Sequence, residues 1–249
     1  MPHDVGMREP PPISPPMQIH LTVLPDAPCP YLPDRVQTLR AVNASSIDGQ
    51  TYLAFMNAGF RRSGRMIYQN VCRGCRECIP LRVPVATFEP SSSQRRTYRR
   101  NSDLRLEVAA PQASDEKFEL YGRYVSQWHN RAEEAERQSF ELFLYDSPTE
   151  TLEFTYRDGD GRLMAVGICD ISRQSLSSVY FYFDPAEAKR SLGTYGALRE
   201  IDFCREHRIA YYYLGFWVRD CVAMTYKANF RPYELLDQAG RWTAPLSNP

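Results

Sequence analysis

The second half of the chain alternates helical and strand patterns in an order that few folds accommodate. A helix is predicted to begin at Ser114, because two acidic residues follow it and large apolar side chains then recur at helical spacing. Two apolar strands, Leu152–Tyr156 and Leu163–Asp170, flank Asp-Gly-Asp-Gly at 158–161 and predict a hairpin. The elements predicted after the hairpin are a strand at 177–183, a helix at 196–207, a strand at 211–216, a short helix at 222–228 and a strand at 233–236.

This order resembles that of acetyltransferase-like (GNAT-type) domains. In that fold the strand before the long helix splays from the next strand, and an acyl donor enters the gap. We therefore expect an α/β (α+β) protein with a GNAT-type domain over 111–249 and a smaller Cys- and Arg-containing domain over 18–110. Residues 1–17 are expected to be a disordered tail, because the six prolines among residues 2–16 disfavour both helix and sheet.

The first half shows weaker patterns. Strands are predicted at 20–24 and 65–70, and a helix after the capping-box sequence Ser45–Asp48 ends at Gly59. A further strand at 81–88 is expected near a sheet edge because it contains Pro84. Ser91–Asn101 is polar and basic and predicts a boundary loop or an RNA-binding arm.

Composition narrows the class of protein. No apolar run approaches the ~20 residues that a membrane helix needs, and the N-terminus is unlike a secretory signal. Seven cysteines without an export signal favour reduced thiols or a metal site over disulfides, which predicts a soluble cytoplasmic protein.

Charge is unevenly distributed along a chain whose net charge is zero. The segment from Arg61 to Arg100 holds ten arginines, no lysine and two acids, a local balance of +8. Such a block predicts a localised anionic partner, and arginine favours bidentate contacts with phosphate or carboxylate. A solvated basic surface is the alternative.

A glycine-containing turn precedes the predicted helix at 196–207. Its sequence, Arg190-Ser-Leu-Gly-Thr-Tyr-Gly196, resembles the phosphate-binding turn of acetyltransferases, in which backbone N–H groups and a helix N-terminus hold the donor. The second glycine comes one residue late, which counts against coenzyme A as the donor. An ordinary capping loop is the alternative.

Six segments together resemble the arginyl-tRNA–protein transferase family and, at this chain length, its bacterial aspartate/glutamate leucyltransferase members. They are GFRRSG at 59–64, CRGCRECIPLR at 72–82, SVYFYFDP at 178–185, GTYGALREI at 193–201, YYLGFWVRDC at 212–221 and MTYKANFRP at 224–232. The resemblance spans about Cys29 to Leu236. It implies an N-degron enzyme that moves leucine from aminoacyl-tRNA to the N-terminal amine of proteins beginning with Asp or Glu.

The resemblance and the residue types together suggest roles. Because the donor is an activated ester, the site need only align the amine and stabilise the oxyanion, so no cofactor is required. Candidates for assisting catalysis are Asp184, Tyr226, Lys227 and His129; the donor-binding candidates are Arg190, Gly193, Tyr195, Gly196 and Trp217. Each aromatic could instead be core, Lys227 could lie on a solvated helix face, and His129 could be structural.

The basic block divides into two groups of candidates. Arg61, Arg62 and Arg65 could clamp the acceptor carboxylate from a Gly-flanked loop, or bind tRNA phosphate instead. Candidates for contacts with the tRNA backbone are Arg95, Arg96, Arg99 and Arg100.

The cysteines suggest a metal site. Cys29, Cys72, Cys75 and Cys78 could hold zinc or an iron–sulfur cluster, as eukaryotic relatives are associated with such a cluster, but this chain lacks their adjacent Cys pair. Free thiols around a substrate loop are the alternative. The remaining three, Cys169, Cys204 and Cys221, are expected in the core.

The donor pocket is expected to suit leucine. Its predicted lining is Val179, Phe181, Phe183, Leu214, Phe216 and Trp217, with charge only at Asp184 and Asp220. Rival functions are arginyl transfer, a coenzyme A-dependent N-acetyltransferase, and a non-catalytic zinc-binding RNA module; the last leaves residues 150–236 without a purpose.

Overall fold

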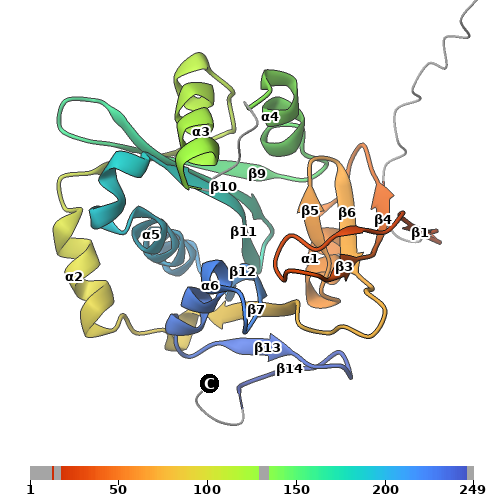
Figure 1. The fold of residues 1–249 in the computed structure, drawn as a ribbon. Helices are drawn as coiled ribbons and strands as arrows, with labels where there is room; N and C mark the ends of the chain where they lie inside the picture. Colours follow the sequence, from red (N-terminus) through yellow and green to blue (C-terminus); the bar gives the residue numbers. More distant parts are fainter. Residues whose placement is uncertain (1–12, 14–17, 129–134, 246–249) are drawn as a thin grey trace, which may run out of the picture.

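The computed structural model describes residue 13 and residues 18–128 and 135–245. Its centre is an eight-stranded sheet of order β14-β13-β7-β12-β11-β10-β9-β8 (Figure 1). The strands are β7 (Ile79–Pro84), β8 (Arg105–Ala109), β9 (Thr151–Arg157), β10 (Leu163–Ile171), β11 (Ser175–Phe183), β12 (Tyr211–Trp217), β13 (Glu234–Leu236) and β14 (Trp242–Thr243). All neighbouring strands run antiparallel except β11 and β12, which are parallel.

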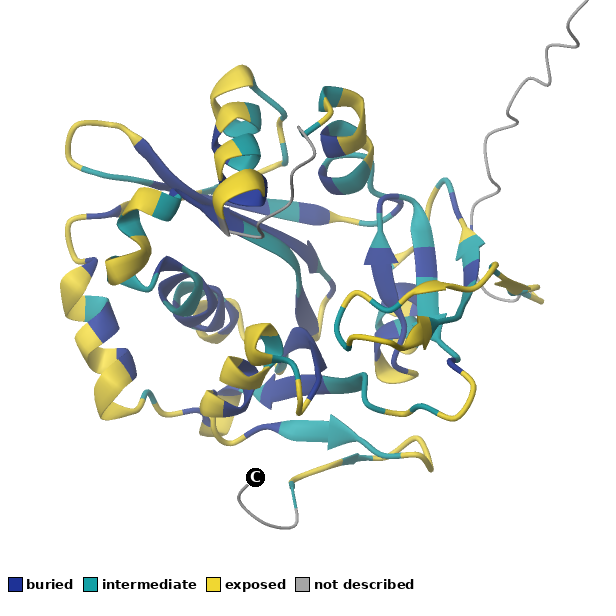
Figure 2. Ribbon diagram, viewed as in Figure 1, coloured by how far each residue is buried: buried dark blue, intermediate teal, exposed yellow. Residues whose placement is uncertain are grey.

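Helices cover both faces of this sheet. α3 (Asp115–Trp128) and α4 (Arg137–Leu144) lie on one face, and α5 (Leu192–Glu206) lies on the other with α2 (Ser92–Arg100) beside it (Figure 1). Strand residues alternate between the layers, so the Tyr182 ring packs on Tyr121 of α3 while the Tyr156 ring packs on Tyr195 of α5. The strands between the helices are the most buried part of the fold (Figure 2).

The parallel pair β11–β12 is short and then diverges. Pairing is confined to Ser175–Ser177 of β11 and Tyr211–Tyr213 of β12. Beyond that point the register of β12 against β7 shifts at Gly215, whose φ of +89° is a conformation that glycine adopts readily. The divergence opens a gap between the C-terminal parts of β11 and β12.

A second, four-stranded sheet is formed by the first part of the chain. Its order is β1 (Thr22–Val23), β4 (Leu39–Asn43), β6 (Met66–Asn70) and β5 (Arg61–Ser63), and α1 (Gly49–Asn57) packs with it around a separate small core. Tyr213 of β12 belongs to this core, so the two sheets share side chains. The smaller elements are β2 (Ala27–Pro28), β3 (Val36–Gln37), η1 (Val85–Thr87), η2 (Pro185–Arg190), α6 (Val222–Thr225) and η3 (Tyr226–Asn229).

The predicted elements of the second half are confirmed; α4, η2 and β14 are additional elements that were not predicted. Three predictions in the first half are wrong. Residues 92–100 form helix α2, which Ser91 and Gln94 cap reciprocally, and Arg61 and Arg62 lie in a strand. Strand β7 lies inside the sheet; Pro84 is tolerated there because it is the last residue, beyond the pairing with β13.

The structure also bears on the two predicted domain boundaries. The division expected at residue 110 cuts through the large sheet, because β7 and β8 from the first part pair with β12 and β9. The expected tail lies outside the described residues except for Ile13, which is buried and pairs with Ile47.

Candidate active site

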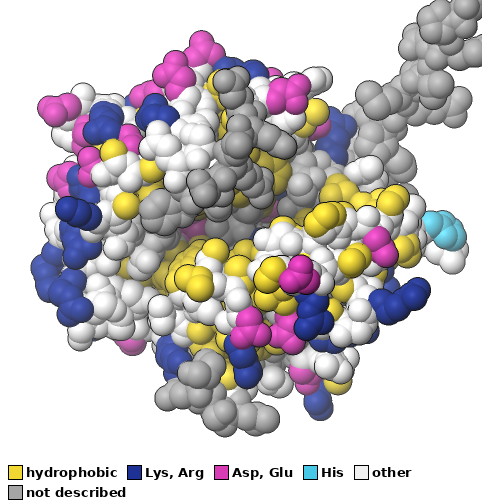
Figure 3. Space-filling view, viewed as in Figure 1, with side chains coloured by type: hydrophobic (Ala, Val, Ile, Leu, Met, Phe, Trp, Pro, Cys, Tyr) yellow, Lys and Arg dark blue, Asp and Glu magenta, His cyan; other side chains and the backbone are white. Residues whose placement is uncertain are grey.

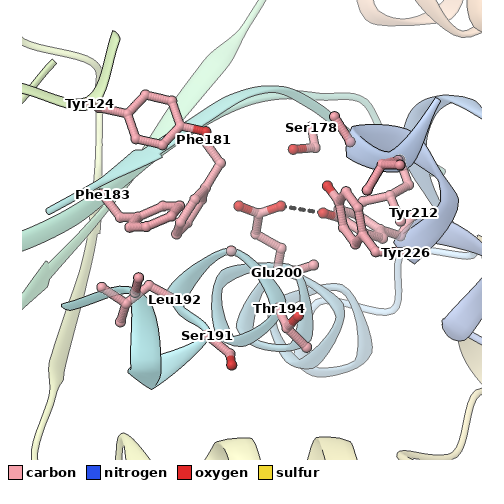
Figure 4. A pocket seen from close by; sticks show the side chains of 16 residues that line it. Tyr124, Ser178, Phe181, Phe183, Ser191, Leu192, Thr194, Glu200, Tyr212 and Tyr226 are labelled. Atoms are coloured by element: carbon pink, nitrogen blue, oxygen red, sulfur yellow. Dashed lines mark hydrogen bonds between the residues drawn. The ribbon is translucent and has the colours of Figure 1, made fainter. Parts of the chain in front are cut away.

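A cavity of about 460 Å³ occupies the gap where β11 and β12 diverge. Its walls come from α3, β11, the start of α5, β12 and α6 (Figure 4), and apolar side chains gather around a hollow on this face of the molecule (Figure 3). The larger apolar residues that line it are Phe181, Phe183, Leu192, Leu214 and Val222. Of the predicted wall, Phe181, Phe183 and Leu214 line this cavity, whereas Val179, Phe216 and Trp217 do not.

Among the residues that the structure describes, Glu200 is the one acid that lines this cavity, and sequence reasoning missed it. Its Oε2 accepts a 2.5 Å hydrogen bond from the Tyr212 hydroxyl, while its Oε1 has no hydrogen-bond partner (Figure 4). A Cβ on Gly167 would lie 2.6 Å from Oε1, so this glycine leaves room for the carboxyl. Burial raises the pKa of Glu200 to about 7. The available signal was an acid at helical spacing among the apolar residues Ala197, Ile201 and Cys204.

The first turn of α5 faces the mouth of the cavity. Ser191, Leu192, Gly193 and Thr194 all line it, and the Ser191 side chain makes no capping hydrogen bond to the helix. A Cβ on Gly193 would meet nothing within 4 Å. An open helix N-terminus beside a cavity suits an anionic or oxyanionic donor group.

The other predicted donor-binding residues serve different contacts. The Arg190 guanidinium pairs with Asp103, and Tyr195 is buried against Tyr98 and Tyr156. Gly196 is a packing position, since a Cβ there would lie 2.1 Å from the Phe181 ring. Trp217 is buried. The structure therefore brings Gly193 alone of these five to the cavity.

Asp184 is engaged in structural contacts rather than held free as a base. It accepts from the Ala186 N–H at 3.0 Å, where it caps η2, and pairs with Arg162 and with Arg123 at 3.5 Å. Although burial alone would raise its pKa, these hydrogen bonds and charges hold the pKa of Asp184 below its usual range.

Tyr226 and Lys227 occupy adjacent positions with different surroundings. Tyr226 lines the cavity, and desolvation raises the pKa of its hydroxyl to about 12, so it stays protonated near neutral pH. Lys227 is buried, and its Nζ donates to the Phe216 carbonyl at 2.8 Å. Burial, and then the neighbouring Arg61 charge, lower the pKa of Lys227 to about 7. His129 lies outside the described residues.

The three candidate acceptor-binding arginines are separated by their partners. Arg62 forms a fully buried ion pair with Asp170 at 2.8 Å, and Arg65 pairs with Asp146 at 2.7 Å. Arg61 instead donates to two neutral groups, Ser177 Oγ at 2.8 Å and the Ser178 carbonyl. Arg61 is therefore the one of the three whose charge is not matched by an acid among the described residues.

Sequence comparison identifies the family. Residues 27–96 match "Arginine-tRNA-protein transferase, N terminus", and residues 116–237 match "Arginine-tRNA-protein transferase, C terminus". The chain belongs to the arginine-tRNA–protein transferase family. The prediction that this protein is an enzyme, an aminoacyl-tRNA–protein transferase, is confirmed.

The names of individual relatives agree with this family assignment. The chain is 40% identical to the aspartate/glutamate leucyltransferase of Hahella chejuensis, over 85% of this chain and 92% of that protein. It is 37% identical to the protein of the same name from Saccharophagus degradans, over 84% and 89%. The fold resembles the C-terminal domain of a putative lysylphosphatidylglycerol synthetase from Agrobacterium fabrum, with TM-score 0.50, 16% identity, and coverage of 78% of this chain and 65% of that one. The predicted acetyltransferase-like α/β fold is confirmed.

The predicted tRNA-contacting arginines of this transferase family member lie on one surface. Arg95, Arg96, Arg99 and Arg100 are exposed on α2, whose buried Gln94 and Thr97 face inward. Basic side chains gather at the side of the molecule where α2 lies (Figure 3). Arg100 donates to the Lys189 carbonyl at 2.6 Å, so α2 contacts the segment that leads into the cavity mouth at Ser191.

The four cysteines of the candidate metal group lie close enough together for their charges to interact. The four thiols of Cys29, Cys72, Cys75 and Cys78 are free, and burial followed by the charges of the other three raises the pKa of Cys78 to about 12. Within residues 18–128 and 135–245 no group of three or more His, Cys, Asp or Glu side chains is arranged to hold a metal ion. Cys169 and Cys204 are buried as predicted, and Cys221 is half-buried. In the same part of the chain no helix is long and apolar enough to cross a membrane.

Proposed function

We propose that the chain transfers leucine from Leu-tRNA to the N-terminal α-amine of proteins that begin with Asp or Glu, in the cytoplasm. The observation that carries this is the apolar cavity at the β11–β12 divergence, with an open helix N-terminus at its mouth. The names of the two leucyltransferase relatives support the same reaction.

Leucyl transfer depends more on alignment of the acceptor amine with the ester than on activation of either group. The acceptor α-amine has a pKa near ~8, so a useful fraction is neutral at pH 7. It attacks the leucyl ester carbonyl; the new C–N bond forms, the ester C–O bond breaks, and the tRNA 3′ oxygen leaves with the proton that the amine loses. Alignment of amine and ester can supply ~7–11 kcal/mol. Tyr226 is the candidate whose protonated hydroxyl lies on the cavity wall, where it can donate to an oxygen of the reacting ester.

The cavity favours leucine over arginine as the donated residue. Burial of a leucyl side chain against Phe181, Phe183 and Leu214 contributes ~1.5–3 kcal/mol. An arginyl side chain would need an ionised partner. Glu200, the one acid that lines the cavity among the described residues, has a pKa raised to about 7 and is already bonded to Tyr212. The lining thus suits a neutral side chain best.

A basic surface beside the cavity mouth suits the tRNA. Arg100 of α2 donates to the Lys189 carbonyl, and Ser191, two residues further along the chain, lines the cavity. Phosphates on α2 would leave the charged 3′ end directed toward the first turn of α5.

The test is a transfer assay with radiolabelled Leu-tRNA or Arg-tRNA and peptides that begin with Asp, Glu, Lys or Ala. We expect Leu-tRNA to label the Asp and Glu peptides best. Leu214→Glu, which charges the cavity wall, should abolish transfer, whereas Leu142→Glu on the exposed face of α4 should leave it unchanged. Better transfer from Arg-tRNA, or a thermal shift with acetyl-CoA but none with Leu-tRNA, would contradict the proposal.

A further inference from the structure

One buried acid lacks the cationic partner that the others have. Among the residues that the structure describes, four acidic side chains are buried, and three of them pair with a cation. These pairs are Asp170–Arg62, Glu153–Lys117 and Asp184–Arg162. Glu200, which is 1% exposed, forms no ion pair with any described residue. A buried carboxylate without a counter-charge is costly, so the exception indicates a cationic group that arrives from outside the protein.

The surroundings of the Glu200 carboxyl are neutral. The Tyr212 hydroxyl donates to Oε2 at 2.5 Å, and Oε1 has no hydrogen-bond partner (Figure 4). Burial, the largest effect, raises the pKa of Glu200 to about 7, although the neutral groups of Tyr212, Cys169 and Ser178 favour its charged form. The carboxyl is therefore close to half-protonated at neutral pH, and a cation beside it would favour the charged form.

Glu200 lies in the cavity at the β11–β12 divergence, which the proposed function assigns to the donor and which we name the donor cavity. It projects from α5 between Phe181 and Tyr212, and lines the cavity with both of them (Figure 4). Gly167 of β10 leaves room for the carboxyl, since a Cβ there would lie 2.6 Å from Oε1. Of the described residues that line the cavity, the others are apolar or neutral. The donor cavity thus offers apolar walls and one acid.

A leucyl ester brings the matching two features. Its α-carbon carries both an apolar side chain and an amine, so the side chain cannot enter the cavity without the amine beside it. An α-amine has a pKa near ~8 and is largely an ammonium at pH 7. A desolvated ammonium needs an acceptor, and a carboxylate gives it a charge-assisted hydrogen bond. Apolar walls with one acid therefore suit an α-amino acyl group better than a plain acyl group.

We propose that Glu200 binds the α-ammonium group of the donor's leucyl residue, and that this contact distinguishes an aminoacyl donor from an acyl donor without an amine. This rests on the proposed function, which supplies the leucyl ester. Tyr212 holds one carboxyl oxygen, which leaves the other for the ammonium. An ammonium nitrogen has no lone pair, so the contact also keeps the donor's own amine from acting as a nucleophile.

The same contact bears on which donors are rejected. The α-ammonium is common to every aminoacyl donor, so Glu200 is engaged whichever residue the tRNA carries. No other acid among the described residues that line the cavity then remains for the guanidinium of an arginyl donor. An acetyl group has no amine, so it would leave the buried carboxyl without a cation.

The experiment compares Leu-tRNA with 2-hydroxyisocaproyl-tRNA, in which a hydroxyl replaces the α-amine while the ester and the side chain stay the same. The ratio of kcat/KM between the two donors is measured with a saturating peptide that begins with Asp, and this ratio cancels any loss of folded protein. The proteins are the wild type, Glu200→Gln, which keeps the size of the side chain without its charge, and Glu206→Gln, a control at the exposed end of the same helix.

We expect the wild type and Glu206→Gln to favour Leu-tRNA by at least about tenfold, because a hydrogen bond between charged groups is lost with the hydroxyl donor. Glu200→Gln should lose most of that preference.

A binding measurement needs no transfer, so it separates this inference from the proposed function. The probes are leucine and 2-hydroxyisocaproate, each joined by an amide to 3′-amino-3′-deoxyadenosine as an unreactive mimic of the charged 3′ end. Calorimetry with the full chain should show tighter binding of the leucyl mimic to the wild type and nearly equal binding of the two mimics to Glu200→Gln.

Three outcomes decide between the readings. A preference for the amine that Glu200→Gln retains overturns the proposal, as does equal use and equal binding of the two donors by the wild type. An equal fall in kcat for both donors in Glu200→Gln, at an unchanged ratio, also overturns it, because Glu200 would then act on the fold or on a proton of the acceptor. If the wild type transfers no leucine but binds the leucyl mimic better through Glu200, the proposed function alone fails.

Discussion

The donor cavity and the cation pair of Arg61 and Lys227 are neighbours with opposite character. The cavity has apolar walls and one buried acid, Glu200, which can become neutral by taking up a proton. The cation pair is polar and brings two buried basic side chains to one point of β12. The difference teaches that β12 separates an apolar space, which favours a neutral side chain, from a point at which two basic side chains meet.

The two regions also differ in their construction. Residues that line the donor cavity all come from the second half of the chain, between Tyr124 and Tyr226. The cation pair joins β5 of the first half to η3 of the second. The meeting of Arg61 with Lys227 therefore depends on docking of the small sheet, whereas the donor cavity is internal to the large one.

The largest expected effect separates helix packing from donor binding within the turn at Arg190–Gly196. Gly196→Val should prevent α5 from packing on β11, because even the Cβ would lie 2.1 Å from the Phe181 ring; we expect a loss of roughly 3 kcal/mol or more in unfolding free energy. At Gly193, the matched position, an added Cβ would meet nothing within 4 Å, so Gly193→Val should fold normally and still lose transfer by narrowing the cavity mouth. Urea denaturation and the transfer assay check both.

The opposite pattern would break the comparison. If Gly193→Val stays fully active while folded, the first turn of α5 does not hold the donor. If Gly196→Val is as stable as the wild type, α5 and β11 are not packed as described.

The sequence predicted the framework better than the site. Aromatic strands around a long helix have strong periodicity, so the order of strands and α-helices from Leu152 to Leu236 was predicted correctly, whereas helix α4 before them was not. Helix α2 was missed because its polarity resembles that of a loop, and only its Ser91–Gln94 capping pattern marked it. The meeting of Arg61 with Lys227 depends on the docking of two sheets, which no local pattern encodes. Glu200 was missed because one acid in a helix is ordinary until its burial is known.

A smaller expected effect, on the pH dependence of stability, tests the contrast in buried charge between the donor cavity and the cation pair. The pKa of Glu200 is raised to about 7 from an ordinary 4.5, so the folded state binds the proton more tightly than the unfolded state does. The resulting stability is fully present below about pH 4.5 and is lost as pH rises through 7, a change of roughly 3 kcal/mol. Glu200→Gln should remove this component. Unfolding free energies of both proteins at pH 5 and 8 measure it.

Lys227 should give a dependence of unfolding free energy on pH that has the opposite sign. Its pKa is lowered to about 7 from 10.5, so the unfolded state binds more protons between those values and stability rises with pH across that window. Lys227→Met should flatten this rise. Parallel slopes for the two variants would mean that the cavity and the cation pair do not differ in buried charge as argued.

The smallest expected effect tests whether tRNA contacts only the surface beside the donor cavity. Replacement of Arg95, Arg96, Arg99 and Arg100 by Ala should lower the slope of log affinity for Leu-tRNA against log salt by roughly 3, because four phosphate contacts no longer release counter-ions. At physiological salt we expect about a tenfold loss of tRNA affinity. The peptide KM should stay constant, because Arg100 of α2 contacts the segment that leads to the mouth of the donor cavity. Arg173→Ala with Arg241→Ala, two exposed arginines away from α2, is the control for lost positive charge. An unchanged salt slope in the α2 variant would place the tRNA elsewhere, and a raised peptide KM would show that α2 serves the acceptor as well as the donor.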